Sequence, residues 1–416
     1  MYDWANSAFA TTIMAALFPP FYRSLVTNAG LAANTATAYW GYTTSIALII
    51  IALIAPVLGA IADYTGGKKK YAAFFVVLGI ISTATFVFIG TDTWILASIL
   101  YIMGNLGFSG ANIFYESLLP HIALKNDIDQ ISTKGYALGY VGGGILLSIN
   151  ALWIMKYELF GMPDIAFALR ASFLSVAVWW AMFSIPFFWR VPEPPIFTII
   201  RPSLNIIKIG FSRLATTFQE IKRYKQLLIF LIAFWLYNDG INTIIKMATA
   251  YGDEIGIKVT DMTIGLIITQ FVGIPFSFLF GTLAKKLGTK QSILMGLSVY
   301  LLISISGYFM QTAIHFYILA FMVGTVQGGS QALSRSLYGA MVPKHKSAEF
   351  FGFYSTSSKF GGIAGPMVFG LVSQIAGQSR LSILSLILFF VIGGVVLSRV
   401  KVAEGILTAR ATNVVK

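Results

Sequence analysis

Cysteine is absent from this chain of 416 residues, and histidine occurs only three times. Without cysteine, the chain has no disulfide framework, no thiolate metal site and no thiol redox chemistry. The histidines, His121, His315 and His345, lie far apart and do not have the spacing of metal ligands. A Gly-x-x-x-x-Gly-Lys-Ser/Thr loop is also missing, which argues against direct use of ATP. We therefore expect no metal and no cofactor.

Charged residues are scarce as well, at 11% of the chain, whereas hydrophobic residues make up 57% and the mean hydropathy is +0.78. These values lie outside the range of soluble globular proteins and predict a protein whose main partner is the lipid bilayer. The formal net charge of +13 would also suit a nucleic-acid-binding protein. The positions of the basic residues decide between these two explanations.

Twelve apolar segments are long enough to cross a bilayer, which takes about 20 residues. They predict an all-α polytopic membrane protein with twelve transmembrane helices. The predicted spans are 2–21, 37–62, 71–90, 94–119, 132–155, 166–189, 227–251, 262–284, 291–310, 315–340, 350–375 and 381–400.

Lysine and arginine are distributed unequally between the two sides of these spans. Of the 29 basic residues, 21 fall on the side that carries both termini, five fall on the opposite side, and three lie within spans. An excess of basic residues marks the cytoplasmic side. Both termini are therefore predicted to be cytoplasmic, and the positive charge needs no nucleic-acid partner.

Polar motifs inside the spans occur twice, half a chain apart. Asp3-Trp4-Ala5-Asn6-Ser7 and Asp239-Gly240-Ile241-Asn242-Thr243 share the order Asp-x-x-Asn-Ser/Thr. Further landmarks recur in the same order, namely Gly59-x-x-x-Asp63-x-x-Gly66 with Gly281-x-x-x-Lys285-x-x-Gly288, Glu116-Ser117-Leu118 with Arg335-Ser336-Leu337, and Gly135-Tyr136 with Gly352-Phe353. This repetition predicts a membrane protein built from two parallel six-helix halves.

The repeat divides the chain into four parts. Residues 1–190 form a first six-helix bundle, 191–226 a cytoplasmic linker, 227–400 a second bundle and 401–416 a cytoplasmic tail. Within the linker, apolar residues recur every three or four positions, which predicts an amphipathic helix. This helix either lies on the anionic inner leaflet or only joins the two halves. Its apolar residues are Leu204, Ile207, Phe211, Leu214, Phe218 and Ile221.

The second copy of the motif supplies the candidate substrate-binding or coupling residues. Asp239, Asn242, Thr243 and Lys246 share one stripe of a predicted helix, with Asp239 near the middle of its span. A carboxylate, an amide, a hydroxyl and an ammonium on one stripe can hold a zwitterionic solute. Alternatively, Asp239 pairs with Lys246 or with Lys359 and only holds helices together, because charges inside a bundle serve both purposes.

In the first copy, Asp3, Asn6 and Ser7 repeat the stripe, but Ala10 stands where the second copy has Lys246. The two halves thus differ in a way that an asymmetric solute would require. Asp3 also lies close to the start of its predicted helix, where it would instead cap the N-terminus. A tyrosine precedes each motif, as Tyr2 and Tyr237, and we count Tyr237 among the candidate site residues.

Candidate gating residues lie near the predicted cytoplasmic ends of the spans. Glu116 and Arg335 occupy corresponding positions in the two halves, where they either pair across the halves or bond within their own half. Gly59 and Gly66 allow close helix approach and a tight turn. The carboxylate of Asp63 can accept hydrogen bonds from the end of a neighbouring helix.

The Gly59–Gly66 motif and the twelve-span repeat resemble the major facilitator superfamily. The string Tyr2-Asp3-Trp4-Ala5-Asn6-Ser7-Ala8-Phe9-Ala10-Thr11-Thr12, together with Tyr237-Asn238-Asp239-Gly240 and Glu349-Phe350-Phe351-Gly352-Phe353-Tyr354-Ser355, is similar to its vacuole-effluxer-like branch. That branch includes fungal autophagy permeases that release amino acids from the vacuole. The resemblance covers nearly the whole chain and implies the major facilitator fold, a small-molecule solute and amino-acid export.

We therefore predict a secondary transporter that works by alternating access, with protons as the candidate coupling ion, and not an enzyme. A monomer in the plasma membrane of a bacterium is expected, or in the vacuolar membrane if the source is eukaryotic. A lipid flippase or scramblase on the same fold is the alternative. An intramembrane enzyme is disfavoured, because Gly107-Phe108-Ser109-Gly110 resembles a protease motif but lacks a mid-span histidine to act as a base.

Overall fold

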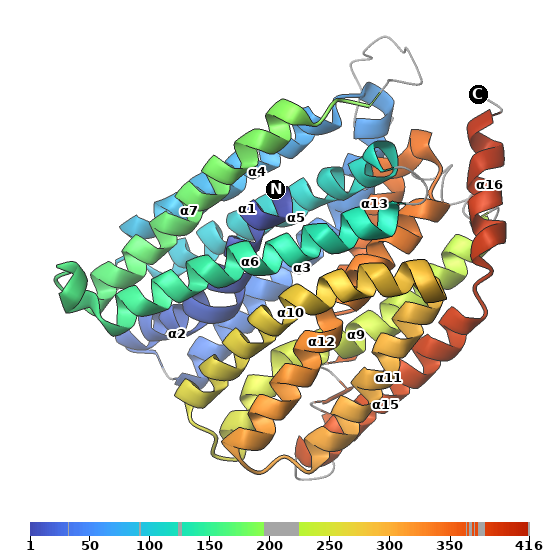
Figure 1. The fold of residues 1–416 in the computed structure, drawn as a ribbon. Helices are drawn as coiled ribbons and strands as arrows, with labels where there is room; N and C mark the ends of the chain where they lie inside the picture. The colour runs from blue at the N-terminus through green and yellow to red at the C-terminus, as the bar shows by residue number, and fades with distance from the viewer. Residues whose placement is uncertain are drawn as a thin grey trace. The chain divides into compact units, whose positions relative to one another are not determined.

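The structure, a computed structural model, describes residues 1–31, 33–90, 93–123, 127–194, 224–362, 364–365, 368–369, 371–372 and 379–414. Every regular element within these residues is a helix (Figure 1). The prediction of an all-α protein is confirmed. The predicted amphipathic helix of the linker lies outside the described residues.

The helices follow one another along the chain with short connections. They are α1 (Tyr2–Ala8), the π-helix η1 (Phe9–Leu17), α2 (Phe18–Asn28), α3 (Ala33–Thr65), α4 (Lys68–Thr85), η2 (Phe86–Phe88), α5 (Trp94–Ile122), α6 (Ile128–Met155), η3 (Tyr157–Phe160), α7 (Ile165–Arg190), α9 (Lys225–Glu254), α10 (Val259–Leu287), α11 (Thr289–Tyr308), α12 (Ala313–Met341), η5 (Lys344–Lys346), α13 (Ser347–Phe360), α15 (Ser379–Ser398) and α16 (Val402–Val414).

Ten helices of the described chain are long and apolar enough to cross a membrane. They match ten of the twelve predicted spans. The two other predicted spans are divided into shorter elements. Residues 2–21 form α1, η1 and the start of α2, and residues 350–375 begin in α13, which ends at Phe360. Both of these interrupted segments carry candidate site residues.

Contacts divide the chain into two compact units. Unit 1 comprises Met1–Leu53, Gly67–Tyr115 and Leu138–Glu193, and unit 2 comprises Ile54–Gly66, Glu116–Ala137 and Pro194–Lys416. Unit 2 therefore includes, besides the second half of the chain, the end of α3, the end of α5 and the start of α6. These three segments are the ones that the basic residues place on the cytoplasmic side.

Aromatic side chains form much of the interior of unit 1. Phe18 is fully buried, with its ring centroid 4.5 Å from that of Phe86 and 5.3 Å from that of Tyr101. On α7, Trp180 is fully buried against Phe9 of η1, at 5.4 Å between centroids. Lipid tails are as apolar as these side chains, so close packing rather than escape from water holds such helices together.

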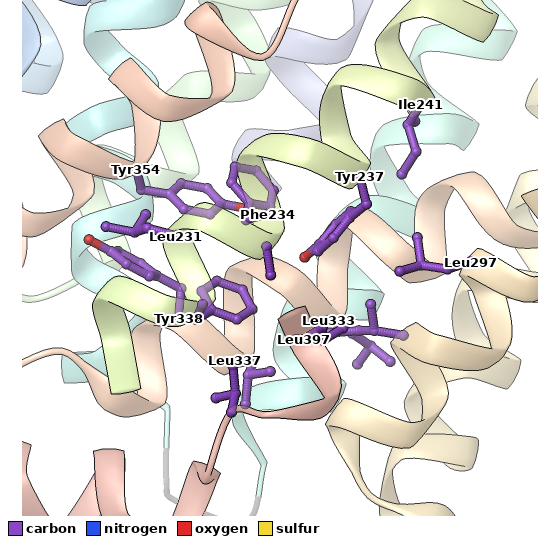
Figure 2. Close-up of a cluster of buried hydrophobic side chains, with 14 of the residues drawn as sticks. Leu231, Phe234, Tyr237, Ile241, Leu297, Leu333, Leu337, Tyr338, Tyr354 and Leu397 are labelled. Carbon is purple, nitrogen blue, oxygen red and sulfur yellow. The ribbon is translucent and has the colours of Figure 1, made fainter. Parts of the chain in front are cut away.

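In unit 2 the largest apolar cluster surrounds α9, which passes between residues of α11, α12, α13 and α15 (Figure 2). The rings of Phe234 on α9 and Tyr354 on α13 stack with their centroids 4.4 Å apart. Tyr237 is also buried in this cluster, and its hydroxyl group makes a hydrogen bond of 2.6 Å with Ser334 Oγ on α12. This packing fixes the rotation of α9 and thereby the direction of its polar stripe.

Candidate functional site

Asp239 on α9 is the most deeply buried acid of the predicted substrate stripe, with 1% of its surface exposed. Its Oδ2 accepts a hydrogen bond of 2.9 Å from the backbone N–H of Gly365. Its Oδ1 is buried and has no hydrogen-bond partner within the described part of the chain. A buried carboxylate oxygen without a partner is costly. This oxygen is therefore a place where a proton or another ligand would be stabilised.

Thr243 lies one turn after Asp239 and is fully buried, and its Oγ1 donates a 2.7 Å hydrogen bond to the Asp239 carbonyl. Gly365 approaches both residues closely. A Cβ atom at position 365 would overlap Thr243 Oγ1 and lie 2.8 Å from Asp239 Oδ1. Only glycine allows the main chain to come near enough for its N–H to reach the carboxylate.

Lys246 completes the stripe at its far end. Its side chain is exposed, and its Nζ donates a hydrogen bond of 3.1 Å to the carbonyl oxygen of Gly362. Asn242, between the two charged residues, is half-buried. The four stripe residues thus differ in access: Asp239 and Thr243 are closed off, whereas Lys246 and part of Asn242 can be reached by a solute.

Both charged residues of α9 bind main-chain groups just after the end of α13. This helix ends at Phe360, and Gly361 and Gly362 form a turn. A helix end leaves N–H and C=O groups without intrahelical partners, and these groups need partners inside a membrane. Lys246 and Asp239 supply them, one for a carbonyl and one for an N–H. Lys359 lies on α13 as predicted, but its side chain is outside the described residues.

The first copy of the motif is held in unit 1 by a polar ladder. Asp3 Oδ2 accepts a hydrogen bond of 2.6 Å from the hydroxyl of Tyr115, and Asn6 Nδ2 donates one of 2.7 Å to Asn112 Oδ1. Residues three apart on α1 thus bond to residues three apart on α5. Asp3 is the second residue of α1, whose N-cap position is Met1. Ser7, one turn further, lies against Gly139 of α6.

Sequence reasoning did not assign Asn112 to the site, and it mentioned Tyr115 only as a ring that might line a cavity. Both are half-buried. The spacing of three residues between them, matching Asp3 and Asn6, is a signal in the sequence that points to paired helices. Without knowledge of which helices are neighbours, that signal could not be used.

Directly after this ladder, the chain leaves α-helical geometry and forms the π-helix η1. Such segments are rare and often occur at functional sites. Thr11 within η1 is buried, and its Oγ1 donates to the carbonyl of Ser7 at 2.9 Å. The motifs in both halves therefore lie next to irregular backbone: η1 follows the first, and the end of α13 adjoins the second.

The predicted gating residues of the first half contact the start of α13. Asp63 Oδ2 accepts a hydrogen bond of 2.8 Å from the backbone N–H of Glu349, in the first turn of that helix. A Cβ at Gly59 would overlap the carbonyl oxygen of Ala348. Gly66 has a φ of +72°, in the left-handed region that glycine adopts readily, and ends the turn after α3.

The matching motif of the second half makes the corresponding contacts with the start of α6. A Cβ at Gly281 of α10 would overlap Thr133 Oγ1, and Lys285 Nζ lies 3.9 Å from Asp127 Oδ1. Thus α3 contacts α13, whose counterpart in the repeat is α6, and α10 contacts α6. This crosswise arrangement is what a duplicated protein would produce at its cytoplasmic end.

Arg335, the other predicted gating residue, is 3% exposed. Its Nε donates to Ser132 Oγ at 2.9 Å, its Nη2 donates to the Ser132 carbonyl at 3.0 Å, and its guanidinium lies 4.6 Å from the ring centre of Tyr136. All of these contacts are with the start of α6. Tyr354 lies within electrostatic range of both Glu116 and Arg335. A direct Glu116–Arg335 gating pair stays a prediction.

An acid that the sequence analysis did not single out reinforces this contact. Asp129 on α6 accepts hydrogen bonds from Ser336 Oγ of α12 and, at 2.6 Å, from Thr289 Oγ1 of α11. The start of α6 is therefore bonded to two helices of the second half. Such a set of polar contacts is suited to hold one side of a carrier closed.

Arg335→Lys should weaken this closed arrangement, because an ammonium cannot reproduce the two parallel donations to Ser132 or the stacking on Tyr136. We expect a loss of about 1–3 kcal/mol from the α6–α12 contact, seen as faster labelling of a cysteine introduced at Ser132. The exposed Arg23 provides the matched control as Arg23→Lys. Equal labelling in the two variants would show that Arg335 does not hold the contact.

Ser109, within the motif that resembles a protease sequence, donates a 3.2 Å hydrogen bond to Asn105 Oδ1 on its own helix. Its neighbour Gly107 lies so near α4 that a Cβ there would be 2.5 Å from Gly79 Cα. These contacts are those of small residues at a helix–helix interface. In addition, no group of three or more His, Cys, Asp or Glu side chains among the described residues could hold a metal ion.

The helical fold, with its two interrupted spans and its polar residues inside the bundle, is that of major facilitator superfamily transporters. The proton:xylose symporter XylE, solved with 6-bromo-6-deoxy-D-glucose, superposes with a TM-score of 0.70 at 15% identity, over 95% of this chain and 92% of that one. The transporter FucP, in its outward conformation, also gives 0.70, at 12% identity over 95% and 97%. At these identities the likeness establishes the fold alone.

The sequence gives a closer placement. Residues 1–410 match the family described as "Vacuole effluxer Atg22 like". The MFS-type transporter YxiO of Bacillus subtilis (strain 168) is 40% identical over 96% of this chain and 92% of its own length. Autophagy-related protein 22 of Eremothecium gossypii is 23% identical over 81% of this chain and 72% of its own. The chain belongs to the Atg22-like family and is a multi-pass MFS-type transporter, as the motifs predicted.

Proposed function

We propose that this protein exports a small zwitterionic solute, of the amino-acid class, by alternating access coupled to protons. The observation that carries the proposal is the unequal burial of opposite charges on one stripe of α9. Lys246 is exposed, whereas Asp239 is 1% exposed and keeps one carboxylate oxygen without a partner in the described residues.

This difference assigns different tasks to the two residues. An exposed ammonium within a membrane span can bind the carboxylate of a solute with a charge-assisted hydrogen bond. A carboxylate enclosed on all sides cannot be reached by a solute of that size in this state, but a proton can reach it. Lys246 therefore serves substrate binding and Asp239 serves coupling, with Asn242 and Thr243 as the polar groups between them.

In unit 1, the half-buried side chains of Asp3, Ser7, Asn112 and Tyr115 are suited to the other end of the solute. Asp3 supplies a negative charge for an ammonium group, and the amides and hydroxyls supply neutral hydrogen bonds. A solute held by Lys246 and by Asp3 would have to carry both charges. Lys359 is a second candidate cation for the carboxylate.

Gating is proposed at the contacts within unit 2. Docking of α3 on α13, through Asp63, Gly59 and Gly66, and docking of α6 on α12, through Arg335, would keep the cytoplasmic side closed. Glu116, near the end of α5, would join this network. Opening would require these hydrogen bonds to break together, so that the carrier has two discrete states.

The direction and the membrane follow from weaker support. The family description names a vacuole effluxer, which favours export, and the relative with 40% identity is bacterial. We propose a monomer in a bacterial plasma membrane, with both termini cytoplasmic and with bundles 1–190 and 227–400 joined by the linker 191–226. Residues 401–416 would form a cytoplasmic tail.

The test is counterflow of a labelled amino-acid panel in proteoliposomes, with and without a pH gradient. We expect uptake of at least one amino acid above protein-free vesicles, and accumulation only when a gradient is imposed. A parallel measurement follows a fluorescent phospholipid. Movement of the lipid without movement of any amino acid would overturn the proposal in favour of a flippase or scramblase.

A further inference from the structure

The helix α13 is held at its start by three contacts within unit 2. Asp63 accepts the N–H of Glu349, the carbonyl of Ala348 lies against Gly59, and Ser347 Oγ is 3.0 Å from His121 Nε2. Ser347 and Ala348 are both fully buried. The start of α13 is thus part of the predicted gate.

The chain that follows α13 is held by the predicted substrate site. Gly362 donates its carbonyl lone pair to Lys246 at 3.1 Å, and Gly365 donates its N–H to Asp239 at 2.9 Å. One helix of 14 residues, about 20 Å long, therefore connects the gate to the site. Its middle is packed firmly, since Phe350, Phe351 and Tyr354 are at most 6% exposed.

Of the two bonds at the site end, that of Lys246 is the one a solute can break. The ammonium is exposed and its partner is a neutral carbonyl. A hydrogen bond from an ammonium to a carboxylate is roughly twice as strong as one between neutral groups. A solute carboxylate that reaches Lys246 would therefore displace the Gly362 carbonyl and leave it without a partner.

We propose that Lys246 detects the solute by exchanging the Gly362 carbonyl for the carboxylate of the solute, and that this exchange loosens α13 at the gate. The inference rests on the proposed function and adds to it. It makes Lys246 the residue that selects carboxylate-bearing solutes, and it makes α13 the element that carries occupancy to Asp63. Since both states of Lys246 are bonded, the change is a switch between partners.

The experiment uses the absence of cysteine from the chain. Ala348→Cys places a single thiol at the buried start of α13, and its rate of labelling by a maleimide in the purified full-length protein reports release of that end. Ser347→Cys is a second reporter in case the first disturbs the contact. Ser24→Cys, at an exposed position, controls for the reagent.

The first arm contains no solute. Lys246→Gln keeps a neutral donor for the Gly362 carbonyl, whereas Lys246→Met removes it. Labelling at position 348 should rise at least threefold in the methionine variant over the glutamine variant, and position 24 should label equally in both. Equal labelling at 348 would show that Lys246 does not hold α13, and would overturn the inference whatever the substrate is.

The second arm adds amino acids, amines without a carboxylate, or carboxylates without an amine to the chain with Lys246. Amino acids and carboxylates should raise labelling at 348, and amines should not. With Lys246→Gln, none should change it. If counterflow shows amino-acid transport while labelling does not respond, the inference fails and the proposed function stands. If the first arm succeeds but no panel member is transported, the proposed substrate class fails and the tether stands.

Discussion

Asp239→Asn should abolish accumulation of solute against a gradient while exchange at equal pH continues. With one proton moved per solute, each pH unit supplies about 1.4 kcal/mol, enough for roughly tenfold accumulation. Asparagine can still accept the N–H of Gly365, so the contact near the end of α13 is kept, but it cannot bind and release a proton. Accumulation should therefore fall from about tenfold per pH unit to none.

The matched control is Asp3→Asn in the other copy of the motif. Asp3 is half-buried and accepts a hydrogen bond from Tyr115, so we expect a weaker apparent affinity with accumulation retained. Loss of both accumulation and exchange in correctly folded Asp239→Asn would move Asp239 into substrate binding. Normal accumulation in that variant would exclude coupling at this carboxylate. Accumulation and exchange are both measured in the same proteoliposomes.

How far the sequence could predict this site depends on the kind of information involved. The stripe of Asp239, Asn242, Thr243 and Lys246 follows from helical spacing, because α9 is an uninterrupted helix. The partners of Asp239 and Lys246 do not follow from it. They are main-chain groups beyond the end of α13, and an apolar pattern that continues from 350 to 375 does not disclose that the helix ends at Phe360.

The gate shows the same division. That Asp63 would bond to the end of a neighbouring helix was predictable from its position after α3, and the structure supplies that bond from Glu349. The partners of Arg335 were not foreseen. Pairing Glu116 with Arg335 assumed that equivalent residues of a repeat meet, whereas the observed contacts run crosswise, from α3 to α13 and from α10 and α12 to α6. Which helices meet is a property of the fold and not of one motif.

Gly59→Ala should displace the closed arrangement more than any side-chain exchange at the gate. The added Cβ would overlap the Ala348 carbonyl and lie 2.7 Å from Glu349 Cα, and neither main-chain atom can turn away as a flexible side chain would. Overpacking of this kind costs about 1–3 kcal/mol, equivalent to a shift of about 5- to 150-fold toward the undocked state. The gain in helix propensity, up to about 1 kcal/mol for Gly→Ala, acts in both states and does not offset it.

Gly41→Ala is the control, because it lies on the same helix and a Cβ there would meet nothing within 4 Å. It should leave docking unchanged and at most stabilise α3. The measurement is maleimide labelling of Ser347→Cys in each background, since that residue is fully buried while α13 is docked. Labelling should be fast with Gly59→Ala and slow with Gly41→Ala. Slow labelling in both would mean that α3 can shift by a few tenths of an ångström without undocking. In that case Gly59 serves only to turn the chain, and the hydrogen bond from Glu349 to Asp63 must hold the gate by itself.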